Sequence, residues 1–207
     1  MNPDLKVIVE NALYFIALLN PASKVMFLST YEPALSRKQI FELSWKSSCA
    51  AFVLLMVFEL VGIFVLKSIF RIELYALQIT GGLVIFAIGW LAVREGRFFQ
   101  RQENDLQQDF NEISIVPLAA PLIAGPGTIT IVISYSALYG NLSCAISVFI
   151  ALLVNFVVML FSQPISYLLH MLHLAGPLIR ITGLVVAAVA IQMVLGGLSQ
   201  WLKAAGL

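Results

Sequence analysis

The sequence predicts an all-α membrane protein of six transmembrane helices, with no soluble domain of any size. Hydrophobic residues make up 60% of its 207 residues, and charged residues only 11%. A soluble domain carries roughly 25% charged residues, because its surface must be wetted. The chain also contains six long apolar stretches, and about 20 apolar residues are enough to cross the hydrocarbon core of a bilayer.

The six expected helices are joined by short connectors. They cover Val7–Tyr31, Ser47–Leu66, Leu74–Val93, Ile115–Tyr139, Ala145–Leu169 and Leu178–Trp201. A segment inside lipid must satisfy its own backbone hydrogen bonds, which leaves helices and closed barrels. The strict alternation of a barrel strand is absent, so helices are expected.

Lys and Arg residues near the helix ends predict the orientation. Seven of them lie in the connectors after the first, third and fifth helices, against four at the termini and in the other connectors. The richer side normally faces the cytoplasm. Both termini are therefore expected outside. The net charge of +1 provides no basic footprint for nucleic acid.

The chain divides into two similar halves, 1–93 and 113–207, joined by a polar connector, 94–112. Ile79-Thr80-Gly81-Gly82 in the third helix resembles Ile181-Thr182-Gly183-Leu184 in the sixth. Each half holds three helices, an odd number, so the second half must enter the membrane from the opposite side. Such an inverted repeat is typical of secondary transporters.

The first helix of each half carries a proline near its middle. Asn20-Pro21 interrupts one, and Gly125-Pro126-Gly127 interrupts the other. Proline removes a helical hydrogen bond and clashes with the preceding turn, but it is favoured at the first position of a new helix. Asn is a good cap before that position, and glycine frees the backbone. Two half-helices are therefore expected in each span.

A half-helix that starts at membrane depth presents free N–H groups and a positive dipole end. Such ends bind anions, including carboxylates. A small zwitterionic solute is expected between the two breaks, with hydroxyl contacts from Ser23, Thr128 and Thr130. The alternative is a pair of proline kinks in a packed bundle, since proline is common in membrane helices.

At these residues the sequence resembles the MarC family of six-helix inner-membrane proteins. The resemblance covers nearly the whole chain and is most specific in the fourth helix. The matching segments are Asn20-Pro21, Ile79-Thr80-Gly81-Gly82, Val116-Pro117-Leu118-Ala119, Ala124-Gly125-Pro126-Gly127-Thr128 and Arg180-Ile181-Thr182-Gly183-Leu184. It implies a prokaryotic inner membrane protein similar to transporters of small neutral amino acids, driven by an ion gradient.

The resemblance also implies which residues lie near the solute. They are Asn20, Pro21, Gly125, Pro126, Gly127 and Thr128. The repeat-matched Thr80, Gly81, Thr182 and Gly183 are expected to allow close packing against the broken helices, as small residues do in membranes. For the two threonines the alternative is a hydroxyl that bonds back to its own helix.

Two charged residues depart from the family pattern. Lys24 lies one turn after Pro21, and Glu59 lies inside the second helix. An ionisable residue in a span is a functional hypothesis by default. Lys24 is expected to pair with Glu59, bind a substrate carboxylate or replace a coupling cation; snorkelling or a structural ion pair is the alternative. Both residues are candidates for coupling to Na⁺ or H⁺.

The residues favour transport over the other classes of function. An enzyme would need a nucleophile and base, a carboxylate pair or metal ligands. Glu59 is the only carboxylate well inside a span, and no Ser/His, Cys/His or His-x-x-x-His arrangement occurs. No enzyme activity, metal or cofactor is therefore expected. A structural or signalling membrane protein and a passive channel are the alternatives, and the oligomeric state is left open.

Overall fold

The structure, a computed structural model, describes residues 5–29, 35–96 and 123–206. Within these ranges most residues are helical and none lies in a strand. The elements are α1 (Leu5–Leu19), α2 (Pro21–Ser29), α3 (Arg37–Phe64), η1 (Val65–Ile69), α4 (Leu74–Glu95), α6 (Pro126–Tyr139), α7 (Asn141–Leu160), α8 (Ser162–Met171) and α9 (Ala175–Ala204). The prediction of an all-α protein is confirmed.

Five helical stretches of the described ranges are long and apolar enough to cross a membrane. They are Leu5–Ser29, Arg37–Ile69, Leu74–Glu95, Asn141–Leu160 and Gly176–Ala204. The expected fourth span, Ile115–Tyr139, is described only from residue 123, and α6 covers 14 residues of it. Most of the expected connector, 94–112, lies outside the described residues. The count of six spans stays a prediction.

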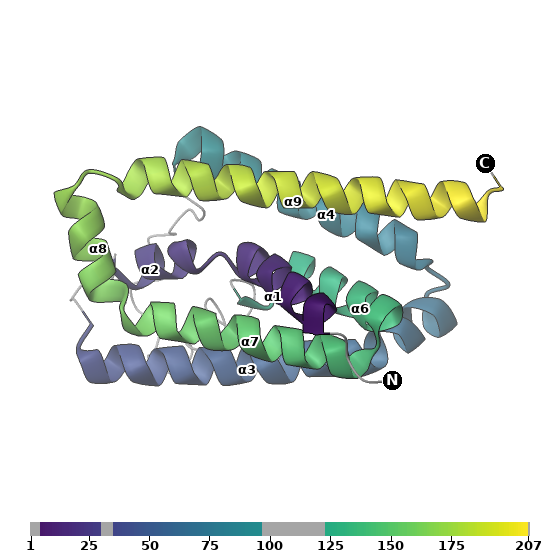
Figure 1. Cartoon of the computed structure of the whole chain (residues 1–207), viewed down its shortest axis with the longest axis horizontal. Helices are drawn as coiled ribbons and strands as arrows, with labels where there is room; N and C mark the ends of the chain where they lie inside the picture. Colours follow the sequence, from purple (N-terminus) through teal and green to yellow (C-terminus); the bar gives the residue numbers. More distant parts are fainter. Residues whose placement is uncertain (1–4, 30–34, 97–122, 207) are drawn as a thin grey trace.

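The helices form three layers along one long axis (Figure 1). α4 and α9 lie side by side along one edge, and α3 and α7 along the opposite edge. α1, α2 and α6 lie between them: α1 contacts α6, α7 and α9, and α6 contacts α3, α4 and α7. The interrupted elements are therefore enclosed between pairs of long helices.

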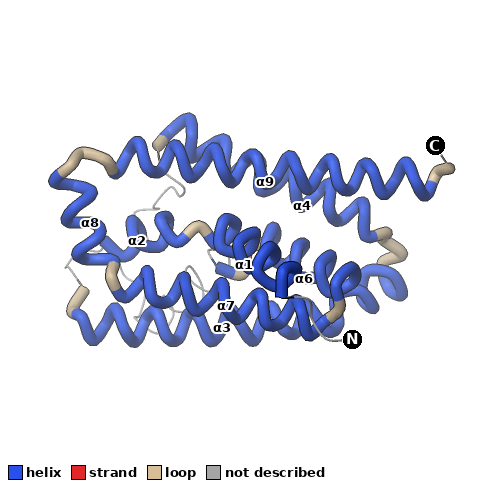
Figure 2. The backbone as a smooth tube through the Cα atoms, in the orientation of Figure 1, coloured by secondary structure: helices blue, strands red, loops and turns tan. Residues whose placement is uncertain are grey.

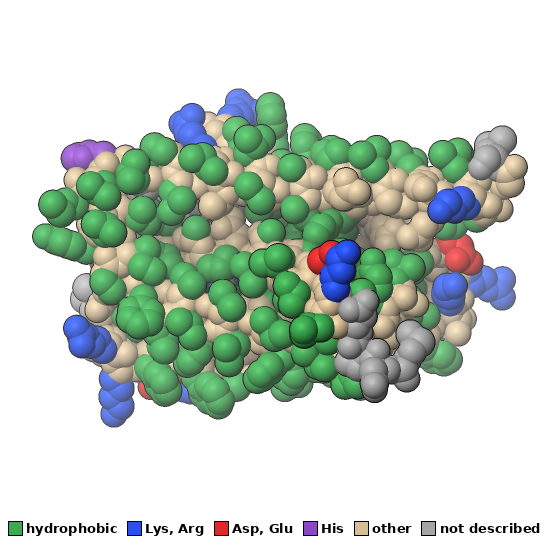
Figure 3. All heavy atoms as spheres, in the orientation of Figure 1, with side chains coloured by type: hydrophobic (Ala, Val, Ile, Leu, Met, Phe, Trp, Pro, Cys, Tyr) green, Lys and Arg blue, Asp and Glu red, His purple; other side chains and the backbone are tan. Residues whose placement is uncertain are grey.

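The outer surface is largely apolar. On the face shown in Figure 3, hydrophobic side chains predominate in the middle, and most charged side chains lie toward the ends of the long axis. Large side chains such as Leu60 (68% exposed) and Leu184 (63% exposed) point outward. An apolar surface of this extent is costly in water and suits the hydrocarbon core of a bilayer.

Glycines bring the backbones of α4 and α9 into contact. A Cβ added at Gly82 would lie 2.8 Å from the carbonyl oxygen of Ala190, and one at Gly89 would lie 2.8 Å from that of Gly183. Gly197 repeats this arrangement further along α9. No side chain fits at such distances, so small residues set the helix separation. α4 and α9 therefore form a tightly packed pair.

The second span is longer than the sequence predicted. α3 begins at Arg37 and not at Ser47, because Ser36 accepts a hydrogen bond from the N–H of Gln39 while the Gln39 side chain accepts from the N–H of Ser36. This reciprocal cap starts a helix in polar sequence. The sequence predicted only the apolar part of this helix, from Ser47, because hydropathy does not register a cap.

The fifth span was expected as one helix, Ala145–Leu169, and this is wrong. α7 ends at Leu160, and α8 then turns away to run toward α9, as Figure 1 shows. Pro164 explains the turn, because it has no N–H to donate and its ring clashes with the carbonyl of Leu160 in a continuous helix.

Candidate functional site

The first break separates α1 from α2 at Asn20 (Figure 2). Its backbone is left-handed, with a φ of 47°, a conformation in which Asn is enriched. The Asn20 N–H donates to the carbonyl of Ile16 (3.0 Å), and the Asn20 carbonyl accepts from the N–H of Ser23 (3.0 Å). Asn20 therefore closes α1. The sequence suggested an N-cap of α2, which would have extended backbone.

Lys24 directs its side chain back to this break. It is 2% exposed, and its Nζ donates a hydrogen bond to the carbonyl of Leu19, the last residue of α1. In a continuous helix that carbonyl would accept the N–H of Ser23, which bonds to Asn20 instead. Lys24 thus binds a carbonyl that the break leaves free. The direction of its side chain agrees with the general tilt of helical side chains toward the N-terminus.

Two further groups belong to the first break. The Ser23 hydroxyl donates to the carbonyl of Asn20 (2.8 Å). The side-chain Nδ2 of Asn20 is buried and has no hydrogen-bond partner among the described residues. The break therefore combines satisfied backbone groups with a free amide donor.

The second expected break precedes α6, and the residues before 123 lie outside the described ranges. Gly125 has extended backbone (φ −75°, ψ 171°), and Pro126 is the first residue of the helix. Any residue adopts this φ, so the backbone does not require glycine at Gly125. The Thr128 hydroxyl donates to the carbonyl of Ile123 (3.1 Å), and the carbonyl of Gly125 accepts the N–H of Ile129 (3.0 Å). The interruption at Pro126 is therefore held by hydrogen bonds on both sides.

Glycine is needed two residues later. A Cβ added at Gly127 would overlap the side chain of Ile85 on α4, and one at Gly81 would lie 2.5 Å from the Oγ1 of Thr130. Thr130 donates its hydroxyl to the carbonyl of Pro126 (2.8 Å), within its own helix. α4 thus packs directly against the first turns of α6.

The two broken segments are neighbours with opposite directions. α1 and α6 run in opposite senses along the long axis in Figure 1. Tyr135 of α6 packs against Tyr14 and Phe15 of α1, with ring centroids 5.6 and 5.8 Å apart. Leu19 and Ile123, which precede the two breaks, belong to one buried hydrophobic cluster.

Glu59 is the other buried charged residue of the described ranges. It is 3% exposed, and no described side chain donates a hydrogen bond to its carboxylate oxygens. It lies beside the first turns of α7, near Cys144 and the backbone of Ala145. Lys24 and Glu59 form no ion pair with each other, and neither pairs with another described residue. The ion pair that the sequence allowed is absent.

The four repeat-matched residues lie in different environments. Gly81 faces α6, as described above, whereas a Cβ at Gly183 would meet Ala92 and the backbone of α4. Gly183 therefore packs against α4 and not against a broken helix. Thr182 donates to the carbonyls of Leu178 and Ile179 in its own helix. Thr80 is exposed.

Sequence reasoning missed the partners of the predicted residues. Ile85, which fills the space above Gly127, is one apolar residue among many, and no pattern marks it. The free carbonyl of Leu19 could have been inferred, because Pro21 ends the hydrogen-bond ladder of α1. Buried polar atoms without partners also occur on Ser44, Ser134 and Asn155, outside the two breaks.

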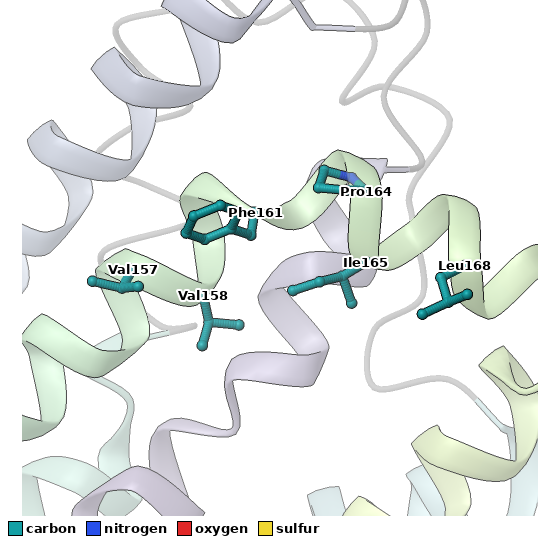
Figure 4. A pocket seen from close by; sticks show the side chains of 6 residues that line it. All are labelled: Val157, Val158, Phe161, Pro164, Ile165 and Leu168. Carbon is teal, nitrogen blue, oxygen red and sulfur yellow. The ribbon is translucent and has the colours of Figure 1, made fainter.

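An apolar hollow lies at the bend between α7 and α8 (Figure 4). Its volume is about 370 Å³, and it is lined by Val157, Val158, Phe161, Pro164, Ile165 and Leu168. Phe161 and Pro164 flank the bend itself. The lining offers no polar side chain that would hold a charged solute, so the two breaks are the better candidate site.

Comparisons with known proteins agree with this architecture. The profile of the MarC family, described as MarC family integral membrane protein, matches residues 5–202. A UPF0056 membrane protein of Pyrococcus horikoshii is 31% identical over 195 residues, covering 93% of this chain and 94% of its own. A UPF0056 membrane protein of Bacillus subtilis is 29% identical over 199 residues, covering 92% and 93%.

No solved structure matches the chain significantly. The family match nevertheless spans α1 to α9, including both breaks and the α4–α9 pair. The chain therefore belongs to the MarC family of integral membrane proteins.

Proposed function

We propose that the protein is a secondary transporter of a small solute that carries a carboxylate. Small neutral amino acids are the class that the family resemblance implies. One observation carries the proposal: α2 and α6 each begin at a proline inside the apolar layers, at Pro21 and at Pro126. Interrupted backbone is tolerated at such depth where it is buried in protein or lines a cavity, and the new helix ends attract anions.

The equivalence of the two breaks supports an inverted repeat of three helices in each half. Ser23 and Thr128 each stand two residues after the proline, and each hydroxyl donates to a carbonyl on the other side of the break. The neighbouring helices α1 and α6 run in opposite senses (Figure 1). On this proposal the six spans place both termini outside a prokaryotic inner membrane, with the solute between the breaks.

Alternating access would follow from movement between two packed units. The α4–α9 pair is held together by glycine contacts along its length. The pair contacts the middle layer of α1, α2 and α6 through α6, where Ile85 of α4 packs against Gly127. A small displacement of the pair would open the solute site to one side and close it to the other, as in other carriers built from repeats.

For ion coupling we propose protons and not sodium. Lys24 places a cation at the carbonyl that ends α1, where a sodium ion would otherwise bind. Glu59 is a buried carboxyl without a side-chain partner among the described residues, and such groups carry protons in many transporters. No cofactor enters the proposal.

The test is uptake into proteoliposomes of purified protein, with a panel of small neutral amino acids and small carboxylates at varied pH and sodium. Accumulation against a gradient, driven by a pH difference, is expected. Gly125→Leu and Pro126→Leu should abolish it. Gly196→Leu is the matched control, since a Cβ there meets nothing within 4 Å.

Three results would oppose the proposal. Uptake that only equilibrates the solute would indicate a passive channel. Full activity of both Gly125→Leu and Pro126→Leu would show that the second break has no role in transport. Uptake of no solute in the panel, together with a co-purifying protein, would favour a structural or signalling role.

A further inference from the structure

Hydrogen-bond donors dominate the free polar groups of the first break. The Asn20 Nδ2 is more than nine-tenths buried and has no partner within the described ranges. The Lys24 ammonium has three N–H groups, and the Leu19 carbonyl accepts one of them. α2 begins here, so its positive dipole end adds to the same field. These groups together are complementary to a ligand that accepts hydrogen bonds and carries negative charge.

The last carbonyl of α1, where an amino acid would place its ammonium group, already accepts a cation. An α-ammonium group would be held best at the C-terminal end of α1, where free carbonyls carry the negative end of the helix dipole. The carbonyl that ends α1 belongs to Leu19, and it accepts the Lys24 side chain. A zwitterion would therefore bring its ammonium next to a lysine ammonium that pairs with no acidic residue of the described part of the chain.

Lys24 also has no counter-charge among the residues that the structure describes. Lys24 is 2% exposed and pairs with no acidic residue of the described ranges. Glu59, the only other buried charge there, lies at the first turns of α7 and does not reach it. A buried, unpaired charge in a membrane is costly, and an anion bound at the break would offset that cost.

We propose that the first break is a site for small monocarboxylates that lack an α-ammonium group, with Lys24 as their counter-charge. The inference rests on the proposed carrier function and narrows its substrate class. Lys24 acts as a specificity-determining residue: it attracts the carboxylate and repels the ammonium of an amino acid.

The test compares three solutes that share a short carbon chain: propionate, L-alanine and ethylammonium. Calorimetric titration of the full-length protein in detergent should give the tightest binding for propionate. L-alanine should bind about tenfold more weakly, the effect expected for one charged hydrogen bond. Ethylammonium should not bind, because it carries only the charge that Lys24 repels.

Two variants of Lys24 separate the effect of its charge from the effect of its side-chain packing. Lys24→Met should weaken propionate binding about tenfold or more and shift the preference toward L-alanine. Lys24→Arg, which keeps the charge, should keep the preference for propionate. Lys67→Met is the control, since Lys67 is exposed and pairs with Glu73 at a distance of 3.7 Å.

Several outcomes would overturn the inference. One is a wild-type protein that prefers L-alanine; another is a monodisperse Lys24→Met protein with unchanged propionate affinity. If L-alanine is both preferred and accumulated in proteoliposomes, only the substrate class fails. If none of the three solutes binds, the inference fails, and uptake of the wider solute panel decides separately on the carrier.

Discussion

The two helix breaks use the same residue, proline, and the same hydroxyl device, yet they differ in what surrounds them. At the first break, Asn20 has left-handed backbone and Lys24 fills the freed carbonyl of Leu19. At the second, Gly125 has ordinary extended backbone and α4 is seated on Gly127. The first break is defined by charge, and the second by packing.

This difference indicates that the two breaks have different roles. The position that matches Lys24, three residues after the proline, is Ile129 in α6. The second break therefore carries no charge of its own at that position. It has instead the closest contact with the α4–α9 pair. On the proposed carrier function, solute selection is expected at the first break, and mechanical coupling at the second.

The largest expected effect concerns packing at the second break. Gly127→Leu should lower stability by about 3 kcal/mol or more, because its side chain would overlap Ile85. The midpoint of thermal unfolding in detergent measures this. Adding Ile85→Ala should recover part of the loss. A single Gly127→Leu protein as stable as the wild type would show that the second break is not set by this contact.

The next effect has the opposite sign and concerns charge at the first break. Lys24→Met should raise stability by about 2 kcal/mol, since a buried unpaired charge is replaced by an apolar side chain of similar length. Transport should fall at the same time. The same thermal measurement, with Lys67→Met as control, checks it. Lower stability on Lys24→Met would mean that the hydrogen bond to Leu19 outweighs the cost of the buried charge.

A third prediction concerns the left-handed backbone of Asn20. Asn20→Ala should cost about 1–2 kcal/mol, because a Cβ without a compensating side chain disfavours this conformation. Asn20→Gly should cost less, since glycine adopts positive φ freely. Thermal unfolding of the two variants gives the comparison. Equal losses would show that the Asn20 side chain, and not its φ, matters at the first break.

The smallest effects are expected where the two breaks are most alike. Ser23→Ala and Thr128→Val each remove one hydroxyl that bonds a carbonyl across the break. Each should cost about 1 kcal/mol, the usual contribution of one hydrogen bond. Unfolding midpoints of the single and double variants test additivity. A strongly unequal pair would contradict the equivalence of the two positions.

The sequence predicted the class of fold because apolar length and low charge are properties of whole segments. It also located the break at Pro21 and the start of α6 at Pro126, since proline acts through local backbone chemistry. It missed two local signals: the cap at Ser36 starts α3 ahead of its apolar stretch, and Pro164 lies just beyond the end of α7. The contact of Ile85 with Gly127 joins distant segments, and no local pattern encodes it.

The charged residues show the same limit, because a local sequence pattern does not predict contacts between distant segments. The sequence singled out Lys24 and Glu59 because ionisable residues are rare in spans. It could not decide whether they meet, since that depends on the relative placement of α2 and α3. The structure keeps them apart, and the candidate site consequently changes from an ion pair to two separate groups.

The length of the second span has a consequence for the surrounding lipid. Arg37–Ile69 contains 33 residues and is about 50 Å long, whereas the hydrocarbon core is about 30 Å thick. Tilting alone does not remove this hydrophobic mismatch. The start of α3, with Lys46 paired to Glu42 (2.7 Å) and Trp45 exposed, is therefore suited to the headgroup region. The acyl-chain length of the surrounding lipid should then change the tilt and depth of the protein in the bilayer, and with them its activity.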